Sequence, residues 1–236
     1  MPTHILVTGT SRGIGRAVLD RLAGDDVTLL GHSTAGGADA IAADLDTDGA
    51  PAALWRDALD RLDGRVDVLV NNAGVFEAAP IDLDDGAWLA AWERTMRINL
   101  TASAALCRLA VNHALAAGRP LRIVNVASRA AYRGDSPAHW HYAASKAGMV
   151  AMTKSIARGH AAHGVLAFAV CPGFTMTGMA EDYLASRGGD KLLADIPLGK
   201  VADPEEVASV ARYCALEAPA SMTGAVIDVN GASYVR

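Results

Sequence analysis

The sequence predicts an α/β protein built on one doubly wound, parallel sheet of about seven strands with helices on both faces. Short runs rich in Val, Ile and Leu alternate along the chain with Ala-rich segments of helical length, which is typical of a parallel sheet. Several runs are apolar throughout, as expected of strands that are covered on both faces. A glycine-rich turn directly follows the first run, at the position where such sheets bind ligands.

Seven segments have the composition of strands. They are His4–Thr8, Val27–Gly31, Ala40–Ala43, Val66–Asn71, Arg122–Ala127, Leu166–Cys171 and Val226–Val229, of which the third is the weakest. Between them, helices are predicted at Gly13–Ala23, Pro51–Leu62, Asp84–Asn99 continuing to Ala117 after a break, Tyr142–Ala162 and Pro204–Leu216. The last helix should begin with Asp203 as its N-cap and Pro204 at its first position.

Two connections depart from the regular alternation. Nine residues lie between Gly31 and Ile41, fewer than the dozen or so that a helical crossover between parallel strands needs. We therefore expect a shortened loop there. The segment 173–200 is long, weakly periodic and contains a Gly-Gly pair, so we expect it to be a substrate lid. Otherwise residues 1–236 predict a single domain.

Composition and charge exclude several functional classes. Apolar residues make up 51% of the chain and charged residues 20%, which excludes a disordered or collagen-like protein. The net charge of −5, without a basic stripe, argues against nucleic-acid binding. No uninterrupted apolar stretch is long enough to span a bilayer, and no signal peptide is evident, so no membrane partner is expected.

The cysteines indicate the compartment. Cys107, Cys171 and Cys214 are far apart and odd in number, and no C-x-x-C motif occurs. A disulfide framework and a structural zinc site are therefore both disfavoured. We expect a soluble protein of a reducing cytoplasm.

The first motif with a chemical role is the glycine-rich turn TGTSRGIG at residues 8–15. Its glycines allow a tight turn and a close approach of the backbone to a pyrophosphate, which would rest on the N-terminus of the next helix. The spacing of Gly9, Gly13 and Gly15 differs from the common G-x-G-x-x-G fingerprint. A glycine-rich turn without a ligand is the alternative.

The second motif is Asn71-Asn72-Ala73-Gly74, which ends the fourth predicted strand. Carboxyl ends of strands line the ligand crevice of doubly wound sheets, and small residues there let adenosine or ribose lie against the backbone. Taken alone, an Asn-rich turn that satisfies its own backbone explains this motif better.

The third motif is Tyr142-Ala143-Ala144-Ser145-Lys146, on a predicted helix. Residues four apart share a helix face, so the phenol and the ammonium point into one site. A nearby ammonium lowers the pKa of a tyrosine from about 10, which suits a general acid for a carbonyl oxygen. Ser128 ends the fifth strand, where its hydroxyl can hold the same oxygen. The alternatives are an ordinary exposed Tyr–Lys pair and a capping serine.

In combination these motifs resemble the short-chain dehydrogenase/reductase family over nearly the whole chain. In family order they are TGTSRGIG at 8–15, NNAG at 71–74, RINL at 97–100, IVNVAS at 123–128, YAASK at 142–146 and CPG at 171–173. Within the family the chain looks most like 3-oxoacyl-carrier-protein reductase-like members, through SRGIGRA, PLGKVADPEEVA and MTGAVIDVNG. The resemblance implies a Rossmann-like fold in which residues 1–236 form a single dinucleotide-binding and catalytic domain. It also implies hydride transfer between a nicotinamide dinucleotide and a small-molecule carbonyl or secondary alcohol.

The resemblance also implies four catalytic residues. Tyr142 would be the acid/base, and Ser128 would orient the substrate oxygen. Lys146 would bind the nicotinamide ribose and lower the pKa of Tyr142, while Asn99 would hold a water that links Lys146 to solvent. The loop between Ser128 and Tyr142 is one residue longer than is usual in the family. Tyr132 is a rival for Tyr142, but no lysine follows it four residues later.

A cofactor site is implied in the same way. Its residues are Gly9, Ser11, Arg12, Gly13, Ile14, Gly15, His32, Ser33, Asp44, Leu45, Asn72, Ala73, Gly74, Tyr142, Lys146, Pro172, Gly173, Thr175 and Thr177. Asn72 would contact the adenosine side, and Asp44 and Leu45 the adenine ring. Pro172 and Gly173, with Thr175 or Thr177, would lie against the nicotinamide amide.

The end of the second strand distinguishes between the two nicotinamide cofactors. Enzymes that prefer NAD place an acid there to bind the ribose 2′-hydroxyl. Here the strand ends Leu30-Gly31-His32-Ser33, and the nearest acid, Asp39, lies well beyond. A 2′-phosphate would meet no like charge and would find donors on Arg12, His32, Ser33 and Thr34. We therefore expect NADP(H), with NAD as the alternative.

Several side chains fit two interpretations. His139, Trp140 and His141 fit loop packing and pocket lining equally well. Met176, Met179 and Tyr183 fit an apolar lid or packing against the sheet edge or another subunit. Trp88 and Trp92 have the spacing of a core or a subunit interface. His160 and His163 have no suitable ligand partner, so no metal site is expected.

Three functions remain open at this point. They are reduction of 3-oxoacyl thioesters, oxidoreduction of another alcohol, sugar or aromatic compound, and non-catalytic dinucleotide binding in a regulatory protein. The third is disfavoured because all four catalytic residue types are present. An acyl-carrier partner would need a basic patch, for which Arg129, Arg133 and Arg187 are the candidates. The resemblance further implies a homotetramer, with the helices of 84–117 and 142–162 and the C-terminal segment at its interfaces.

Overall fold

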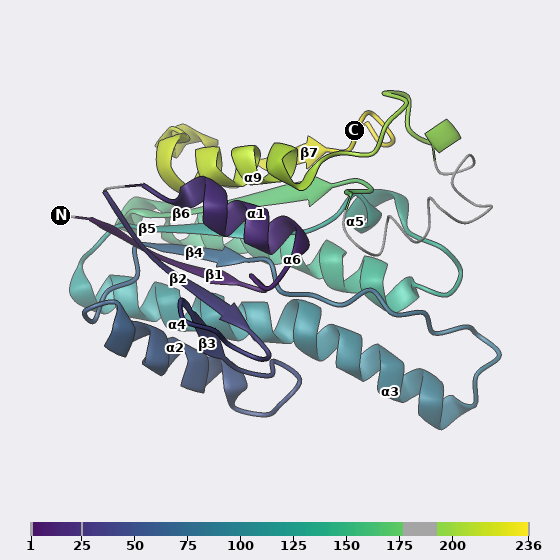
Figure 1. Cartoon of the computed structure of the whole chain (residues 1–236), viewed down its shortest axis with the longest axis horizontal. Helices are drawn as coiled ribbons and strands as arrows, with labels where there is room; N and C mark the ends of the chain where they lie inside the picture. The colour runs from purple at the N-terminus through teal and green to yellow at the C-terminus, as the bar shows by residue number, and fades with distance from the viewer. Residues whose placement is uncertain (1, 25, 177–192, 236) are drawn as a thin grey trace.

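The computed structural model describes residues 2–24, 26–176 and 193–235, which form the predicted doubly wound fold (Figure 1). Seven parallel strands lie in the order β3-β2-β1-β4-β5-β6-β7. They are β1 Thr3–Thr8, β2 Val27–Ser33, β3 Ala40–Ala42, β4 Val68–Asn71, β5 Leu121–Val126, β6 Val165–Pro172 and β7 Val226–Val229. Each overlaps a predicted strand, so the predicted fold class and strand number are confirmed.

The helices also follow the prediction closely. They are α1 Gly13–Leu22, α2 Ala50–Arg61, α3 Asp85–Met96, α4 Ala102–Ala117, α5 Ala130–Arg133, α6 Trp140–His160 and α9 Pro204–Arg212. The short helix α5 was not predicted. α9 begins as expected, with Asp203 as N-cap, Pro204 in the first turn, and Glu206 Oε2 accepting a hydrogen bond from Asp203 N at 2.8 Å.

Helices cover both faces of the sheet, which explains why the central strands are apolar throughout. Successive residues of a strand point to opposite faces, and β1 divides accordingly. Leu6 packs with α2, α4 and part of α6, whereas Ile5 and Val7 pack with α1 and α9. α1 and α9 lie together above the sheet in Figure 1. The core is therefore two apolar layers separated by the sheet.

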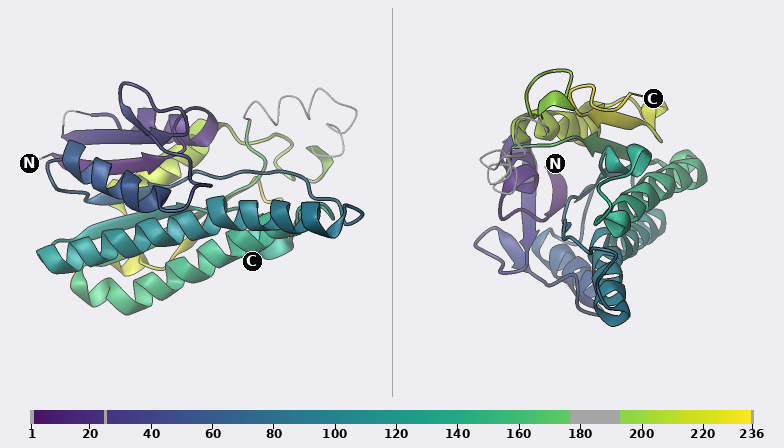
Figure 2. Two further views of the ribbon diagram at one scale, coloured as in Figure 1. Left: turned by 90° about the horizontal axis from the view of Figure 1, so that it is seen from below. Right: turned by 90° about the vertical axis from the view of Figure 1, so that its right-hand side faces the viewer.

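The predicted break near Asn99 is wrong, because the helix continues through it. A π-helical turn, Arg97–Thr101, joins α3 to α4, and the resulting helix runs beside α6 (Figure 2). Asp85–Ala117 has 33 residues and contains an 18-residue window with a mean hydropathy of 1.2, so by length and composition alone it could cross a membrane. Such helices also occur in protein cores, and the α4 half buries Leu106 and Ala110 against the sheet.

The shortened connection between β2 and β3 is confirmed. Residues 34–39 form turns without a helix, and Gly31 N donates a hydrogen bond to Asp39 O at 2.8 Å. Gly36 has a φ of +72°, which reverses the chain within this short span. The connection therefore returns β3 directly to the side of β2.

The expected lid is only partly within the described residues. Thr177, Met179, Tyr183 and Arg187 lie outside them. On the described side, Phe174 and Met176 pack against Leu193, Ile196 and Val201 in a small apolar cluster. Thr175 also forms a parallel bridge with Ala202. The ends of this segment are thus anchored to each other, next to the carboxyl end of β6.

The strand order creates the crevice that positions the site. Within the sheet, β2 is the neighbour of β1 on one side and β4 is its neighbour on the other. The loops after β1 and β4 therefore diverge at the carboxyl edge, which is where open α/β sheets bind ligands. The loops after β5 and β6 extend this edge.

Candidate active site

The glycine-rich turn brings three glycines to the carboxyl end of β1. Gly9 and Gly13 have φ values of +73° and +57°, which L side chains rarely adopt. A Cβ on Gly15 would lie 2.0 Å from Gly9 O. The turn therefore closes directly on the N-terminus of α1, where backbone N–H groups are available to an anion such as a pyrophosphate.

Asn72 braces this turn from the neighbouring strand. Its Nδ2 donates to Thr8 O at 3.0 Å and to Gly9 O at 3.1 Å. The Thr8 hydroxyl in turn accepts hydrogen bonds from the backbone N of Asn72 and of Ala73, each at 3.0 Å. The NNAG motif thus holds the glycine turn in place. Asn72 also lines the cleft, and its Nδ2 is committed to the turn.

His32 has a different role from the predicted one of donating to a 2′-phosphate. Its Nδ1 accepts a hydrogen bond from Gly9 N at 3.3 Å, and its Nε2 lies 2.9 Å from Ala43 O. The first bond needs an unprotonated Nδ1, so Nε2 carries the proton and donates to Ala43. Both ring nitrogens are therefore used, and His32 cannot also donate to a 2′-phosphate. Ser33 is likewise engaged, with Gly36.

These residues line a cleft of about 360 Å³ beside the turn. It contains every predicted residue of the adenosine side: Gly9, Ser11, Arg12, Gly13, Ile14, Gly15, His32, Ser33, Asp44, Leu45, Asn72, Ala73 and Gly74. Arg12 is exposed at the N-cap of α1. Thr34 lines the cleft as well, whereas the acid nearest the end of β2, Asp39, is not among its lining residues.

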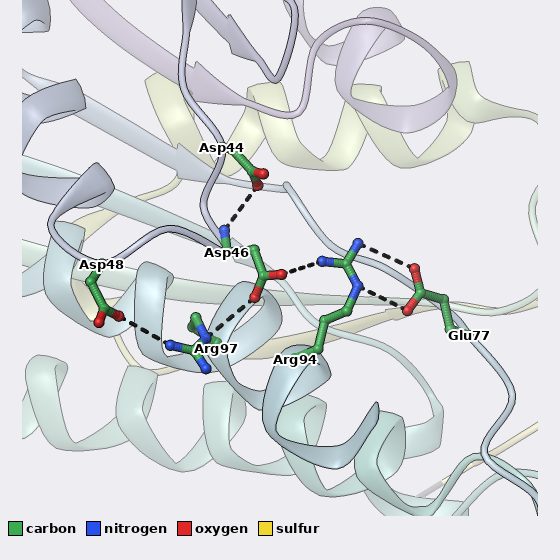
Figure 3. Close-up of polar contacts among 6 residues, drawn as sticks. All are labelled: Asp44, Asp46, Asp48, Glu77, Arg94 and Arg97. Atoms are coloured by element: carbon green, nitrogen blue, oxygen red, sulfur yellow. Dashed lines mark hydrogen bonds and ion pairs between the residues drawn. The ribbon is translucent and has the colours of Figure 1, made fainter. Parts of the chain in front are cut away.

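Arg94, which sequence reasoning missed, also lines this cleft. It forms ion pairs with Asp46 and with Glu77, and Arg97 pairs with Asp46 at 3.3 Å and Asp48 at 3.0 Å (Figure 3). These side chains are partly exposed, so their contribution to stability is small. Their geometric effect is to tie the loop after β3 to α3.

The loop held in this way carries the predicted adenine contacts. Asp44 Oδ1 accepts a hydrogen bond from Asp46 N at 3.0 Å, which tightens the loop at its start (Figure 3). Leu45 is buried and packs into the core layer below the sheet. No motif marks Arg94, so its place in the cleft is evident only from the fold.

A second cleft, of about 410 Å³, adjoins the first and shares Ile14, Asn72, Gly74 and Val75 with it. Ser128, Tyr142 and Lys146 line it together with Pro172, Gly173 and Thr175. The carboxyl end of β5, the start of α6 and the carboxyl end of β6 supply these residues. The structure therefore brings the three predicted polar residues to one continuous cleft.

The electrostatics of Tyr142 differ from the prediction. Desolvation raises its pKa to about 12, and the nearby Ser128 hydroxyl offsets this only in part. Lys146 does not lower it, because its Nζ lies 5.9 Å from the ring centroid and donates to Val126 O at 2.9 Å. Burial lowers the pKa of Lys146 itself to about 8. The phenol is consequently protonated at neutral pH.

Asn99 lies in the π-helical turn and is fully buried. Its Oδ1 accepts from Val75 N at 2.8 Å and its Nδ2 donates to Val75 O at 3.0 Å and to Ser145 Oγ at 3.3 Å. The side-chain amide is therefore a clamp on the backbone after the NNAG motif, and it does not line the second cleft. A Cβ on Gly74 would approach both Asn99 Oδ1 and Lys146 Nζ, so the two groups flank that glycine.

Aromatic rings form one wall of the second cleft. The ring of Phe76 stacks on His139 with centroids 3.9 Å apart, and it meets Tyr142 edge-on at 4.8 Å. His139 therefore lines the cleft, which decides between its two interpretations. Phe76 was missed, although it lies two residues after the NNAG motif. The rival Tyr132 is not among the lining residues and stacks on Tyr234.

Arg129 is not part of a basic surface patch, contrary to expectation. Its side chain is only 10% exposed and lines the second cleft next to Ser128. Arg133 is more exposed and pairs with Asp195. In the described part of the chain, no cluster of His, Cys, Asp and Glu is suitable for a metal ion, and the cysteines form no disulfide.

Known proteins resemble this chain over nearly its whole length. A family model described as enoyl-(acyl carrier protein) reductase matches residues 9–232. A 3-oxoacyl-[acyl-carrier-protein] reductase of Synechocystis is 35% identical and aligns with 96% of this chain and 94% of its own. A cis-4-hydroxycyclohexanecarboxylate dehydrogenase of Sinomonas cyclohexanicum is 36% identical, with the same coverage.

A solved structure has the same fold. A protein from Agrobacterium tumefaciens, described as a 2-deoxy-D-gluconate 3-dehydrogenase with bound NADP, superposes with a TM-score of 0.86. It is 27% identical, and the alignment covers 99% of this chain and 97% of that one. The match to residues 9–232 and the relatives of nearly equal length show that this chain belongs to the short-chain dehydrogenase/reductase family of oxidoreductases.

Proposed function

We propose that this protein is an NADP(H)-dependent oxidoreductase that interconverts a small-molecule carbonyl compound and an alcohol. The observation that carries the proposal is the continuous cleft. It joins a glycine turn suited to a pyrophosphate with Ser128, Tyr142 and Lys146. The alternatives, an NAD(H)-dependent dehydrogenase and a non-catalytic dinucleotide-binding regulator, predict an acid at the end of β2 and the loss of a catalytic residue, respectively.

The residues of the first cleft fit NADP. Because Gly15 has no side chain, the turn can close against Gly9 while its backbone N–H groups face a phosphate. Arg12 and Thr34 are the donors that remain for a 2′-phosphate once His32 and Ser33 are engaged elsewhere. The solved relative from Agrobacterium tumefaciens holds NADP, which supports the same choice here. When bound, this cofactor supplies or accepts the hydride.

The residues of the second cleft supply the proton and orient the substrate. Tyr142, protonated at neutral pH, gives its proton to the oxygen that forms from the carbonyl, and takes it back in the reverse direction. Ser128, at the end of β5, donates a hydrogen bond to the same oxygen and fixes its position. Lys146 lines the same cleft, but its Nζ donates to Val126 O and lies 5.9 Å from the centroid of the Tyr142 ring, so its part is not to lower the pKa of Tyr142.

We assign Lys146 to the ribose hydroxyls and Asn99 to the proton path between Lys146 and solvent. The two flank Gly74, which supports a shared path. Because the Asn99 amide is occupied by Val75 and Ser145, its part is to position the backbone that surrounds this path. Thr175 and the Pro172-Gly173 turn are assigned to the nicotinamide amide.

Two substrate classes are suggested by the relatives. The Synechocystis protein is named for 3-oxoacyl groups on a carrier protein, whereas the Sinomonas dehydrogenase is named for a hydroxy-carboxylate. Both reactions need an oxygen held by Ser128 and Tyr142. The choice between the two substrate classes must therefore depend on the other residues of the second cleft.

We also propose a homotetramer in the cytoplasm. Trp140 and Leu89 on α6 and α3 are about half exposed, and Trp88 stacks on Trp92 nearby, which fits a subunit interface. The absence of a disulfide among the three buried cysteines, all of them described, fits a reducing compartment.

The test is the loss of nicotinamide absorbance with NADPH and carbonyl substrates, with wild type compared with Tyr142→Phe. We expect the variant to bind NADPH normally but to lose about 10²- to 10⁴-fold in kcat, the usual contribution of a general acid. Tyr132→Phe is the matched control, because that ring lies outside the cleft, and it should retain activity. Turnover by Tyr142→Phe within a few-fold of wild type would refute the assignment of the proton to Tyr142.

A further inference from the structure

Arg129 is a buried cation at the reacting end of the cleft. It follows Ser128 directly, and its backbone N donates to Pro172 O at 2.9 Å, so the chain after β5 is tied here to the end of β6. Its side chain is 10% exposed and lines the same cleft as Tyr142 and Ser128. None of the roles assigned above uses it.

The contacts of its guanidinium are incomplete. The group lies 5.2 Å from the centroid of the Phe174 ring, and Nη1 is 3.5 Å from Asp195 Oδ2. Nη1 is buried and makes no hydrogen bond to any described residue. Asp195 is more closely bound to Arg133, whose Nη1 lies 2.6 Å from the same oxygen. Two guanidinium groups therefore share one carboxylate, and Arg129 has the weaker share.

A buried guanidinium with unused donors is costly unless an anion or another acceptor meets it. Desolvation lowers the pKa of Arg129, with the positive charge of Arg133 acting in the same direction. The planar fork of an arginine matches the two oxygens of a carboxylate. Asp135 also lines the cleft and opposes an anion there, but it is exposed to solvent, which screens its charge.

The rest of the cleft suits the carbon skeleton of such a ligand. Phe76 and His139 present a stacked aromatic wall, and Phe174 lies under the guanidinium. A molecule held between Ser128 and Arg129 would therefore have its carbonyl at one end, an apolar middle and an anion at the other end. A 3-oxoacyl thioester is neutral in its reacting portion and leaves Arg129 without a counter-ion.

We propose that Arg129 binds a carboxylate of the substrate, so that the substrates of this enzyme are free oxo- and hydroxy-carboxylates. The assignment rests on the proposed oxidoreductase function and names its substrate class. Arg129 is the residue that determines specificity, and Asp195 is the internal anion that holds its charge when no substrate is present.

The experiment compares 4-oxocyclohexanecarboxylate with its neutral methyl ester, which differ in charge but share the reducible carbonyl. Binding to the enzyme–NADP⁺ complex is measured by calorimetry, and reduction by NADPH absorbance. We expect wild type to favour the acid over the ester by about 10- to 150-fold, the range of a hydrogen-bonded pair with charged groups. Arg129→Met should abolish the preference, and Arg129→Lys should keep part of it.

Two further variants separate a charge effect from a structural one. Arg108→Met, at an exposed arginine of α4 that does not line either cleft, should leave the preference unchanged. Asp195→Asn should increase it, because the internal competitor for Arg129 is removed. NADPH binding by each variant checks that the fold is retained.

An equal affinity of wild type for acid and ester overturns the proposal, whether or not either compound is reduced. So does a preference that survives in Arg129→Met. Failure of the oxidoreductase function gives a different result: NADPH binds but no carbonyl compound, including a 3-oxoacyl thioester, is reduced. The calorimetric comparison of acid and ester is still decisive for Arg129 in that case.

Discussion

Replacing Gly15 by alanine tests whether the glycine turn is shaped by backbone packing. The added Cβ would lie 2.0 Å from Gly9 O and 2.3 Å from Asn72 Nδ2, whereas ordinary contacts begin near 3.4 Å. The Asn72 side chain can rotate away only by giving up its two bonds to the turn. The Gly9 carbonyl is backbone, so the turn itself must move by about 1.4 Å.

The size of the effect follows from this displacement. A turn displaced in this way loses backbone hydrogen bonds to the charged pyrophosphate, each worth about 1.5–3 kcal/mol, so the loss of two should raise the Kd for NADPH by roughly 10²-fold or more. Overpacking of this kind also costs about 1–3 kcal/mol in the free energy of unfolding. For a domain of this size that corresponds to a fall in Tm of about 2–12 °C.

The assay is a fluorescence titration with NADPH, together with thermal unfolding in the absence of the cofactor. Gly159→Ala is the matched control. Gly159 lies on the exposed side of α6, and a Cβ there would meet nothing within 4 Å. The same substitution should therefore leave NADPH binding unchanged and stabilise the protein by about 0.5–1 kcal/mol. Binding of NADPH by Gly15→Ala within about threefold of wild type would refute the reasoning.

Two other predictions concern the cofactor cleft. Arg12→Ala should weaken NADPH binding by about tenfold or more through loss of a charge-assisted hydrogen bond, while NADH binding changes little; an equal loss for both cofactors contradicts the NADP assignment. Burial lowers the pKa of His32, so the unfolded chain takes up this proton first as the pH falls below about 6.5. The free energy of unfolding should then decrease with falling pH by up to about 1.4 kcal/mol per pH unit, until the ring is protonated in the folded state too. Urea denaturation from pH 7.5 to 5.5 should show a shallower dependence in His32→Gln, and parallel curves for the two proteins would contradict this role.

The sheet and its flanking helices were predictable because each depends on local pattern. Continuous apolar runs such as Ile5–Val7 predict strands that are covered on both faces, and the structure buries them on both. The nine residues after Gly31 were too few for a helix, and none forms. The helix was expected to break at Asn99. It instead continues as a π-helical turn, which keeps the backbone hydrogen bonds running through Arg97–Thr101.

The composition of the site was also predictable, but the electrostatics were not. Motifs located Ser128, Tyr142 and Lys146 because their spacing is local. Whether an ammonium lowers the pKa of a phenol depends on distance and burial, and here Lys146 donates to Val126 O while burial of Tyr142 dominates. The commitment of His32 to Gly9 and Ala43 likewise depends on contacts between distant segments.

Residues that no motif marks were the hardest to assign. Arg129 was only a candidate for a basic patch beside the cleft entrance, and only the fold reveals that its side chain lines the cleft. Arg94 and Phe76 are ordinary residues of a helix and a loop in the sequence. Their roles depend on which strands lie side by side.

The two edges of the sheet have a consequence for how copies of this chain can associate. β3 has three residues and β7 has four, whereas β1, β2, β5 and β6 have six to eight. Short edge strands offer few unpaired N–H and C=O groups to a neighbouring strand, which protects against aggregation by edge-to-edge pairing. A second subunit that tried to prolong the sheet would gain only a few main-chain hydrogen bonds. In the proposed homotetramer, contacts between side chains rather than extension of the sheet should therefore join the subunits, and mutations that lengthen β3 would expose a new route to fibrous association.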